Sequence, residues 1–170
     1  MTGRVARAVQ KVSATRGFAR VAPYVVPAVD RGVHRLTRGR VMLSGLLLPS
    51  VVLSVRGARS GVVRRTPLAC VPEWSSSTGV PSPESWLLVG SNFGRESHPA
   101  WTVNLRAHPD AVINWRGVDV PVAARLLRGE ERAAAWGVLV AFWPPYAVYQ
   151  GRVGRELRVF RVVRRGVDQG

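Results

Sequence analysis

The sequence predicts an α+β domain built on a small antiparallel β-barrel. Short apolar, β-branched runs recur from residue 46 onward, tight glycine-containing turns join pairs of them, and only a few segments have helical spacing. The chain has 170 residues, of which 46% are hydrophobic, so one domain with a real core is expected. These patterns do not establish that the barrel closes.

Six apolar runs are expected to be strands: 46–55, 62–71, 86–90, 111–115, 118–125 and 157–163. The first two form a hairpin across a charged turn, and the fourth and fifth form a second hairpin across Arg116 and Gly117. Segment 72–85 is rich in Ser and Pro, which is typical of a surface loop.

Two helices are expected among these strands. Ser97 is a good N-cap residue and Pro99 is tolerated in a first turn, which predicts a helix from Ser97 to about Ala107. A second helix is expected over 129–142. Two acids lie at its positive end, and a Pro-Pro pair follows it and ends it.

Residues 1–40 are expected to form a basic N-terminal helical extension, ahead of a barrel domain over 41–170. The first 22 residues carry five basic side chains and no acid, and three of the bases have helical spacing. Two interpretations stay open for them: a solvated tail, or a helix that lies on an anionic membrane surface. A further helical pattern covers 27–37.

The charge of the chain limits its partners. With 25 basic and 10 acidic residues, the net charge is +15, which favours phosphates, carboxylates, nucleic acid or anionic lipid. Aromatic residues do not interleave with the charges as they do in single-strand binders, so no nucleic-acid partner is expected. The uncharged stretch 41–55 is shorter than a transmembrane helix.

The single cysteine and the absence of several known motifs limit the kinds of reaction to be expected of this protein. Cys70 is the only cysteine and lies in an apolar run, so it is expected to be a core residue, and this usage fits a reducing cytoplasm. The sequence has no glycine-rich nucleotide motif, no Gly-x-Ser-x-Gly nucleophile and no paired His or Cys spacing for a metal. If the protein is an enzyme, a cofactor is expected to supply the reactive atom.

The turn "VRGARSGVVRRTPL", residues 55–68, concentrates positive charge around two glycines. Successive N–H groups of such a turn can form an anion-binding concavity, and Arg59 and Arg64 can pair bidentately with phosphate or carboxylate. The turn therefore indicates an anion site. The alternative is a solvated hairpin whose arginines protect a sheet edge.

A second segment, "SNFGRESHPAWTVNLRAHP", covers residues 91–109. Ser91 ends a strand, where its hydroxyl can face a site, and Trp101 and Leu105 are expected to pack on the core. His98 precedes a proline beside a helix cap, so a structural or solvent-facing role is favoured over that of a general base.

A third segment, "AFWPPYAVYQ", covers residues 141–150. Trp143, Tyr146 and Tyr149 repeat every three residues after a helix end. Aromatic side chains at this spacing can wall a flat pocket, and the alternative is that they pack on the barrel rim.

In combination, "GARSGVVRRTPL", "GSNFGRESHPAWTVNLRAHP" and "PPYAVYQ" resemble, in order and spacing, the deazaflavin (coenzyme F420)-dependent nitroreductase family of actinobacteria. The resemblance covers about 41–165. It implies a split β-barrel of the FMN-binding-like type. It also implies an oxidoreductase that transfers a hydride from reduced coenzyme F420, an 8-hydroxy-5-deazaflavin, to a quinone, a nitroaromatic or an activated C=C or C=N bond.

The resemblance also implies roles for individual residues, since the family's turn motif binds the phosphate and oligoglutamate tail of the coenzyme. The residues expected to bind coenzyme F420 are Arg59, Ser60, Gly61, Arg64, Pro67, Ser91, Asn92, Trp101 and Asn104. Those expected to act in catalysis are Ser91, Tyr146 and Tyr149, and Trp143 joins the two tyrosines in the substrate pocket. No metal is expected.

Four positions depart from the family pattern. Ala58 stands where the family usually has a basic residue, and Asn92 and Phe93 replace the usual polar and glycine residues. Trp143 stands where some members have a tyrosine. Because three of these positions belong to the expected acceptor region, the sequence does not predict the physiological acceptor.

Alternatives from other classes stay open at this point. They are a non-catalytic coenzyme F420-binding or storage protein, a basic membrane-surface module, and a protein that uses FMN or haem on a similar barrel. The expected partner is a small-molecule acceptor, with a homodimer as a further expectation. The expected location is the cytoplasm, with peripheral contact at the inner membrane surface as the alternative.

Overall fold

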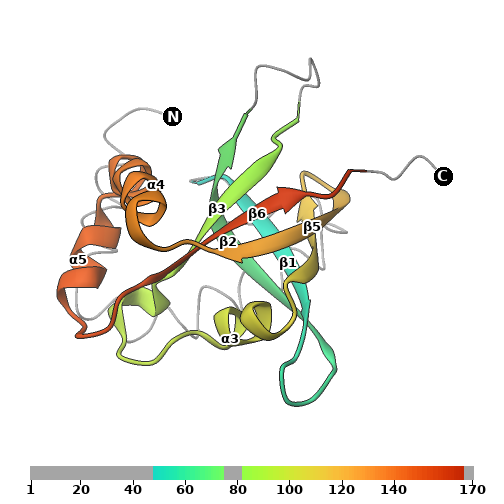
Figure 1. Cartoon of the computed structure of the whole chain (residues 1–170), viewed down its shortest axis with the longest axis horizontal. Helices are drawn as coiled ribbons and strands as arrows, with labels where there is room; N and C mark the ends of the chain where they lie inside the picture. The colour runs from blue at the N-terminus through green and yellow to red at the C-terminus, as the bar shows by residue number, and fades with distance from the viewer. Residues whose placement is uncertain (1–47, 75–81, 167–170) are drawn as a thin grey trace.

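The structure, a computed structural model, describes residues 48–74 and 82–166. Within these residues, six strands form a closed antiparallel barrel in the order β1-β2-β3-β6-β5-β4 (Figure 1). The strands are β1 (Ser50–Arg56), β2 (Val63–Glu73), β3 (Ser85–Gly90), β4 (Asp110–Trp115), β5 (Val118–Leu126) and β6 (Arg158–Arg164). Pairing of β1 with β4 closes the barrel. The predicted fold class is therefore confirmed.

The α-helices of the described chain lie outside the barrel. They are α3 (Ala100–Ala107), α4 (Gly129–Phe142) and α5 (Pro145–Gly151), and a short 3-10 helix, η2 (Asn92–Gly94), follows β3. In Figure 1, α4 and α5 lie together on one side of the barrel, and α3 lies near the β1–β2 turn. The segment that contains η2 connects the two regions.

The barrel interior is the main core. Alternate residues of each strand point into it, as the period of two in a strand requires, and α3 contributes Trp101 and Leu105. Cys70 belongs to this core and is 2% exposed, and burial raises the pKa of its thiol well above the ordinary value. The cysteine is therefore an inert packing residue, as predicted.

Strand β3 is apolar from Trp86 to Val89 because both of its faces are buried. Trp86 and Leu88 belong to the interior cluster, whereas Leu87 and Val89 belong to a second cluster with residues of α4 and α5. This second cluster lies between the barrel wall and the two helices. It is the setting of the aromatic residues discussed below.

Both predicted hairpins are confirmed. β1 pairs with β2 from Ser50 opposite Ala69 to Arg56 opposite Val63, and β4 pairs with β5 up to Trp115 opposite Val118. The predicted loop 72–85 is too long. β2 continues through Glu73 and β3 begins at Ser85, where the Ser85 hydroxyl donates a hydrogen bond to the Glu73 carboxylate (2.6 Å).

The predicted start of the first helix is wrong. α3 begins at Ala100, and Pro99 occupies the N-cap position in an extended conformation. A residue that precedes proline is driven away from helical dihedrals, so His98 does not extend the helix. The Ser97 hydroxyl accepts a hydrogen bond from the Asn92 side chain (3.2 Å) instead of capping α3.

The second helix has the predicted bounds, but the sequence analysis missed α5 after it. α4 covers Gly129–Phe142, and the second proline of the Pro-Pro pair begins α5. Proline suits a first helical position because its missing N–H would have no intrahelical partner there. The pair therefore separates two helices and turns the chain between them.

The predicted extension over 1–40, with the helical patterns at 1–22 and 27–37, lies outside the described residues. Across the part of the chain that the structure describes, no helix combines the length and the apolar character that a membrane crossing needs.

Candidate functional site

The β1–β2 turn is a compact loop over residues 57–62. The Gly57 N–H donates to the Val62 carbonyl (2.9 Å), and the Gly61 N–H donates to the Gly57 carbonyl (2.8 Å). Gly61 has a φ of +67°, a conformation that side-chain-bearing residues rarely adopt, which explains a glycine there. The Ser60 hydroxyl accepts a hydrogen bond from the Val62 N–H (3.3 Å) and braces the turn.

The turn leaves donors and charge without partners. Within the described residues, the N–H groups of Arg59 and Ser60 donate no hydrogen bond, and the exposed side chains of Arg59 and Arg64 form no ion pair. By contrast, Arg161 on the barrel wall holds Glu73 through two hydrogen bonds (2.8 and 3.0 Å). Consecutive N–H groups together with two uncompensated guanidinium groups are suited to an anion.

Helix α3 supports this turn directly. The Asn104 side-chain oxygen accepts a hydrogen bond from the Ala58 N–H (3.0 Å), which ties the helix to the turn. On the same helix, Trp101 is 7% exposed and its ring packs against Phe160, with centroids 5.6 Å apart. Trp101 thus anchors α3 in the barrel core. The hydrogen bond to Asn104 then holds the turn against this fixed helix.

Ser91 lies directly after β3, at the start of the loop that leads to α3. Its side chain is half-buried, and its hydroxyl forms no hydrogen bond with other described residues. The neighbouring Asn92 braces the loop by donating to the Ser97 carbonyl (2.9 Å) and hydroxyl. The loop therefore presents a serine hydroxyl while the asparagine side chain is used within the loop.

The same loop packs on α5. Gly94 has a φ of +75°, and a Cβ there would lie 3.2 Å from the Tyr149 Cα, so any other residue would be strained at this close approach. The Phe93 ring meets the Tyr149 ring edge to face, with centroids 6.4 Å apart, and Tyr149 meets Tyr146 in the same way at 6.4 Å. Ser91 is therefore followed by a continuous line of aromatic contacts.

The predicted pocket aromatics are buried. Trp143, Tyr146 and Tyr149 all belong to the cluster between α4, α5 and the barrel wall, with 9%, 7% and 3% of their surface exposed. Burial raises the pKa of the Tyr146 hydroxyl well above its ordinary value. This phenol therefore stays protonated at neutral pH and can act only as a neutral donor or acceptor.

The structure thus brings the predicted residues together in two groups. Arg59, Ser60, Gly61 and Asn104 meet at the β1–β2 turn, and Ser91 continues through Phe93 to the aromatic residues of α5. Figure 1 shows the turn, α3 and the η2 loop at one end of the barrel, with α5 beside that loop. Pro67 is separate from both groups. It lies within β2, opposite Val52.

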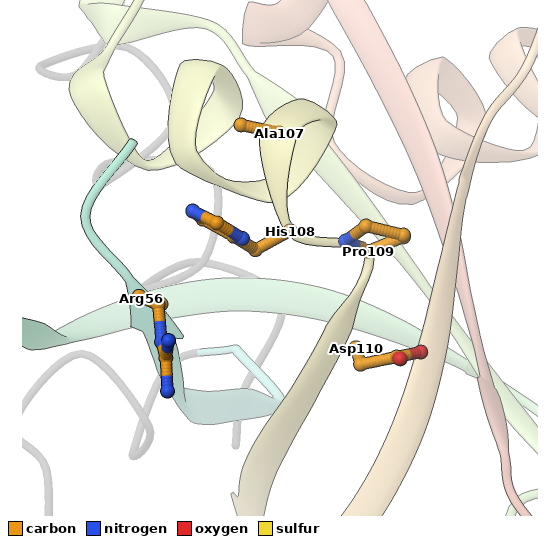
Figure 2. Close-up of a pocket in the computed structure, with 5 residues that line it drawn as sticks. All are labelled: Arg56, Ala107, His108, Pro109 and Asp110. Atoms are coloured by element: carbon orange, nitrogen blue, oxygen red, sulfur yellow. The ribbon is translucent and has the colours of Figure 1, made fainter. Parts of the chain in front are cut away.

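A hollow of about 300 Å³ lies between the end of β1 and the end of α3 (Figure 2). Its lining residues are Arg56, Ala107, His108, Pro109 and Asp110. The Asp110 carboxylate is already paired with Arg165. The hollow contains none of the predicted site residues, so its size alone does not make it the reaction site.

The potential metal-ligating side chains are dispersed in the described part of the chain. In the ranges 48–74 and 82–166, no group of three or more His, Cys, Asp or Glu side chains is placed to hold a metal ion. The two groups above instead combine an anion site with a hydroxyl and aromatic side chains. Such a combination suits an organic cofactor with a charged tail.

The model of the F420H(2)-dependent quinone reductase family matches residues 31–164. The chain belongs to this family. The match covers both groups of site residues and confirms the resemblance seen in the sequence. The protein is an F420H2-dependent reductase of quinones and similar acceptors, and its cofactor is coenzyme F420.

Solved structures resemble this quinone reductase. The F420-H2 dependent reductase FDR-A is 36% identical, over 67% of this chain and 93% of that chain, with a TM-score of 0.56. A structure described as a domain-swapped dimer is 32% identical, over 78% and 94%, with a TM-score of 0.59. A protein of unknown function from Agrobacterium tumefaciens is 13% identical, over 70% and 49%, with a TM-score of 0.52, which shows the fold alone.

The turn of this quinone reductase fits the cofactor. The sequence resemblance implies a coenzyme tail with a phosphate and several carboxylates, and such a tail needs several cations and N–H donors. The turn offers the N–H groups of Arg59 and Ser60 and the guanidinium groups of Arg59 and Arg64, none of which is engaged by a described residue. No carboxylate of the described chain competes for them.

The sequence analysis missed two residues that hold the site in place. Arg155, between α5 and β6, donates to backbone carbonyls of the Ser91 loop from about 60 residues away along the chain. Gly94 permits the loop to contact Tyr149. The sequence contained no local signal for Arg155, because its partners are distant in the chain. Gly94 carried a detectable signal, since it is a glycine in a short loop between a strand and a helix.

Replacing Asn104 by Ala is expected to weaken binding of coenzyme F420 by this quinone reductase about two- to tenfold, the equivalent of one neutral hydrogen bond. The turn would lose its link to α3 through the Ala58 N–H. The dissociation constant can be measured by quenching of coenzyme fluorescence.

Asn114→Ala is the matched control for this prediction. Asn114 accepts a hydrogen bond from the Gly117 N–H (3.2 Å) in the other hairpin turn. The control is expected to keep the wild-type affinity. Equal losses in the two variants would show that Asn104 contributes only general stability.

Proposed function

We propose that Arg59, Arg64 and the N–H groups of the β1–β2 turn bind the phosphate and glutamate tail of coenzyme F420. The observation that carries this proposal is the set of unpaired donors and charges at the turn, on a backbone held by Asn104. Charge-assisted contacts of guanidinium with phosphate or carboxylate are among the strongest polar contacts in proteins. Ser60 and Gly61 contribute by shaping the turn.

Ser91, Tyr146 and Tyr149 are proposed to serve the acceptor. When bound, the reduced coenzyme supplies the hydride for the reaction. The Ser91 hydroxyl is free within the described chain, so it can donate a hydrogen bond to an acceptor oxygen that gains negative charge. The Tyr146 phenol is protonated at neutral pH, as an ordinary phenol is, and burial raises its pKa further. It can therefore serve as a second neutral donor.

The aromatic residues are proposed to shape the acceptor site. Trp143 and the two tyrosines belong to an apolar cluster, which excludes water from its surroundings. A flat, electron-poor ring such as a quinone or a nitroaromatic suits aromatic walls, and activated C=C or C=N bonds are further candidates. Asn92 and Trp101 are proposed to act indirectly, through the loop brace and the α3 anchor described above.

Ser91→Ala is expected to lower kcat for a soluble naphthoquinone about three- to tenfold, the value of one hydrogen bond to the acceptor. Coenzyme affinity should stay at the wild-type level, because the turn is unchanged. Activity is followed as reoxidation of the reduced coenzyme by its visible absorbance. Ser50→Ala, at the half-buried start of β1, is the matched control.

An unchanged kcat in Ser91→Ala would contradict the role proposed for Ser91. A loss of coenzyme affinity would instead indicate contact of Ser91 with the coenzyme, which the family resemblance also implies.

Fluorescence titration with each cofactor compares their affinities for the protein. The wild-type protein is expected to bind coenzyme F420 more tightly than FMN, because FMN has no glutamate tail for the second arginine. Tighter binding of FMN would contradict the proposed use of the turn.

Two partner expectations remain predictions for this chain. A homodimer is supported by the description of one 32% identical structure as a domain-swapped dimer. Peripheral membrane contact was predicted from residues 1–22, which lie outside the described residues.

A further inference from the structure

The guanidinium group of Arg155 is fully used by one loop. Its Nε donates to the Arg95 carbonyl (3.0 Å), and its Nη2 donates to the carbonyls of Ser91 (3.1 Å) and Arg95 (2.8 Å). Its Nη1 lies 3.3 Å from the Gly90 carbonyl and 3.1 Å from His98 Nδ1. A guanidinium has five N–H donors, so all of them have acceptors, and every acceptor lies within residues 90–98.

This loop needs such external support. Asn92 and Phe93 have φ angles of 47° and 55°, in the left-handed region that non-glycine residues rarely adopt. Such conformations persist only where the surroundings over-determine them. The Ser91 carbonyl is one of the groups that Arg155 holds, so the same contact sets the backbone from which the Ser91 hydroxyl projects.

The contact with His98 has a chemical consequence. An arginine N–H can approach Nδ1 only when that nitrogen has a free lone pair, so the ring is neutral and carries its proton on Nε2. Burial, followed by the nearby charges of Arg158, Arg155 and Arg106, lowers the pKa of His98. Arg158 belongs to β6 and Arg106 to α3, and Glu96 acts on Arg155 itself.

We propose that Arg155 is a positioning residue for the reductase, which holds the 90–98 loop so that Ser91 faces the acceptor and keeps His98 as the neutral Nε2–H tautomer. The proposal deepens the proposed function, because it rests on the role of Ser91 there. Arg155 does not touch coenzyme or acceptor in this account. It acts through Ser91 and His98.

The test compares Arg155→Met and Arg155→Lys with Arg128→Met, which removes one exposed guanidinium at the start of α4. Arg155→Met is expected to lower kcat with a naphthoquinone about three- to tenfold, at most the loss expected for Ser91→Ala, because Ser91 is still present but loses its alignment. The coenzyme dissociation constant should change less than about threefold, since Asn104 holds the turn independently. Arg155→Lys, with three N–H donors, is expected to give intermediate values.

The second readout uses coenzyme-free protein. The chain has three histidines, and loss of one signal in His98→Gln assigns the His98 resonance in 15N-histidine-labelled protein. In the wild type, the shifts should show a protonated Nε2 and an unprotonated Nδ1. In Arg155→Met the His98 pKa should rise, because a hydrogen bond and a nearby positive charge are lost. Arg128→Met should leave both readouts at wild-type values.

The proposal is overturned if folded Arg155→Met retains wild-type kcat or the wild-type His98 pKa. Should Arg155→Met fail to fold, Arg155→Lys decides by kcat alone, because lysine keeps a positive charge beside His98, and a wild-type kcat in that variant would overturn the proposal. A failure of the proposed function is distinguishable, because it would appear as a wild-type protein that does not bind coenzyme F420. The His98 titration does not depend on coenzyme and would still decide the contact with Arg155.

Discussion

The double variant Arg59→Met/Arg64→Met is expected to bind coenzyme F420 about 10²- to 10⁴-fold more weakly than the wild type. Each charge-assisted contact contributes roughly 1.5–3 kcal/mol, and about 1.4 kcal/mol corresponds to a tenfold change in affinity. Both side chains are exposed and form no ion pair within the described residues, so thermal stability should stay near the wild-type value. Fluorescence titration and thermal melting measure the two quantities.

The control for this prediction must remove the same charge elsewhere. Arg116→Met/Arg128→Met lowers the net charge by the same amount at two exposed positions away from the turn. If binding depends on a local site, this control should lose little affinity. If both double variants lose affinity equally, the coenzyme responds to the overall positive field of the protein, and the turn has no special role.

Trp101→Ala is expected to lower the free energy of unfolding by about 3–5 kcal/mol, because it removes a large buried side chain from the barrel core. The indole is 7% exposed and packs against Phe160. A loss of this size is a large fraction of the stability of an ordinary domain. Val103→Ala, at a 48% exposed position on the same helix, is expected to change stability by less than about 0.5 kcal/mol.

Trp101→Phe separates two roles for this residue, which was predicted from the family motif to bind coenzyme. The Trp101 indole anchors α3 by packing in the barrel core, and a phenyl ring should keep most of this packing. Coenzyme affinity should then stay near the wild-type value. A large loss of affinity in a variant of normal stability would indicate direct contact between Trp101 and the coenzyme.

Local patterns predicted the fold because most of it is built from neighbouring segments. The β1–β2 and β4–β5 hairpins follow from apolar runs on either side of glycine-containing turns, and α4 has the predicted bounds. Closure of the barrel depends on the pairing of β1 with β4, which are about 60 residues apart. Nothing in either segment alone indicates that partner.

The candidate site was predictable to a similar degree. The turn was identifiable because its charges and glycines are consecutive, and Asn104 because it belongs to a motif. The hydrogen bonds of Arg155 join residues 57 to 65 positions apart, and they left no pattern in the sequence. The start of α3 was misplaced because the effect of Pro99 on His98 outweighed the capping propensity of Ser97.

The central claim is that the turn binds the charged tail of coenzyme F420, and the most direct measurement compares two ligands. One is the complete coenzyme, and the other is the same deazaflavin ending at its ribityl chain, without phosphate or glutamates. The wild type is expected to prefer the complete coenzyme by about 10²-fold or more, and Arg59→Met/Arg64→Met should lose most of that preference. Equal affinity of the wild type for the two ligands would contradict the account.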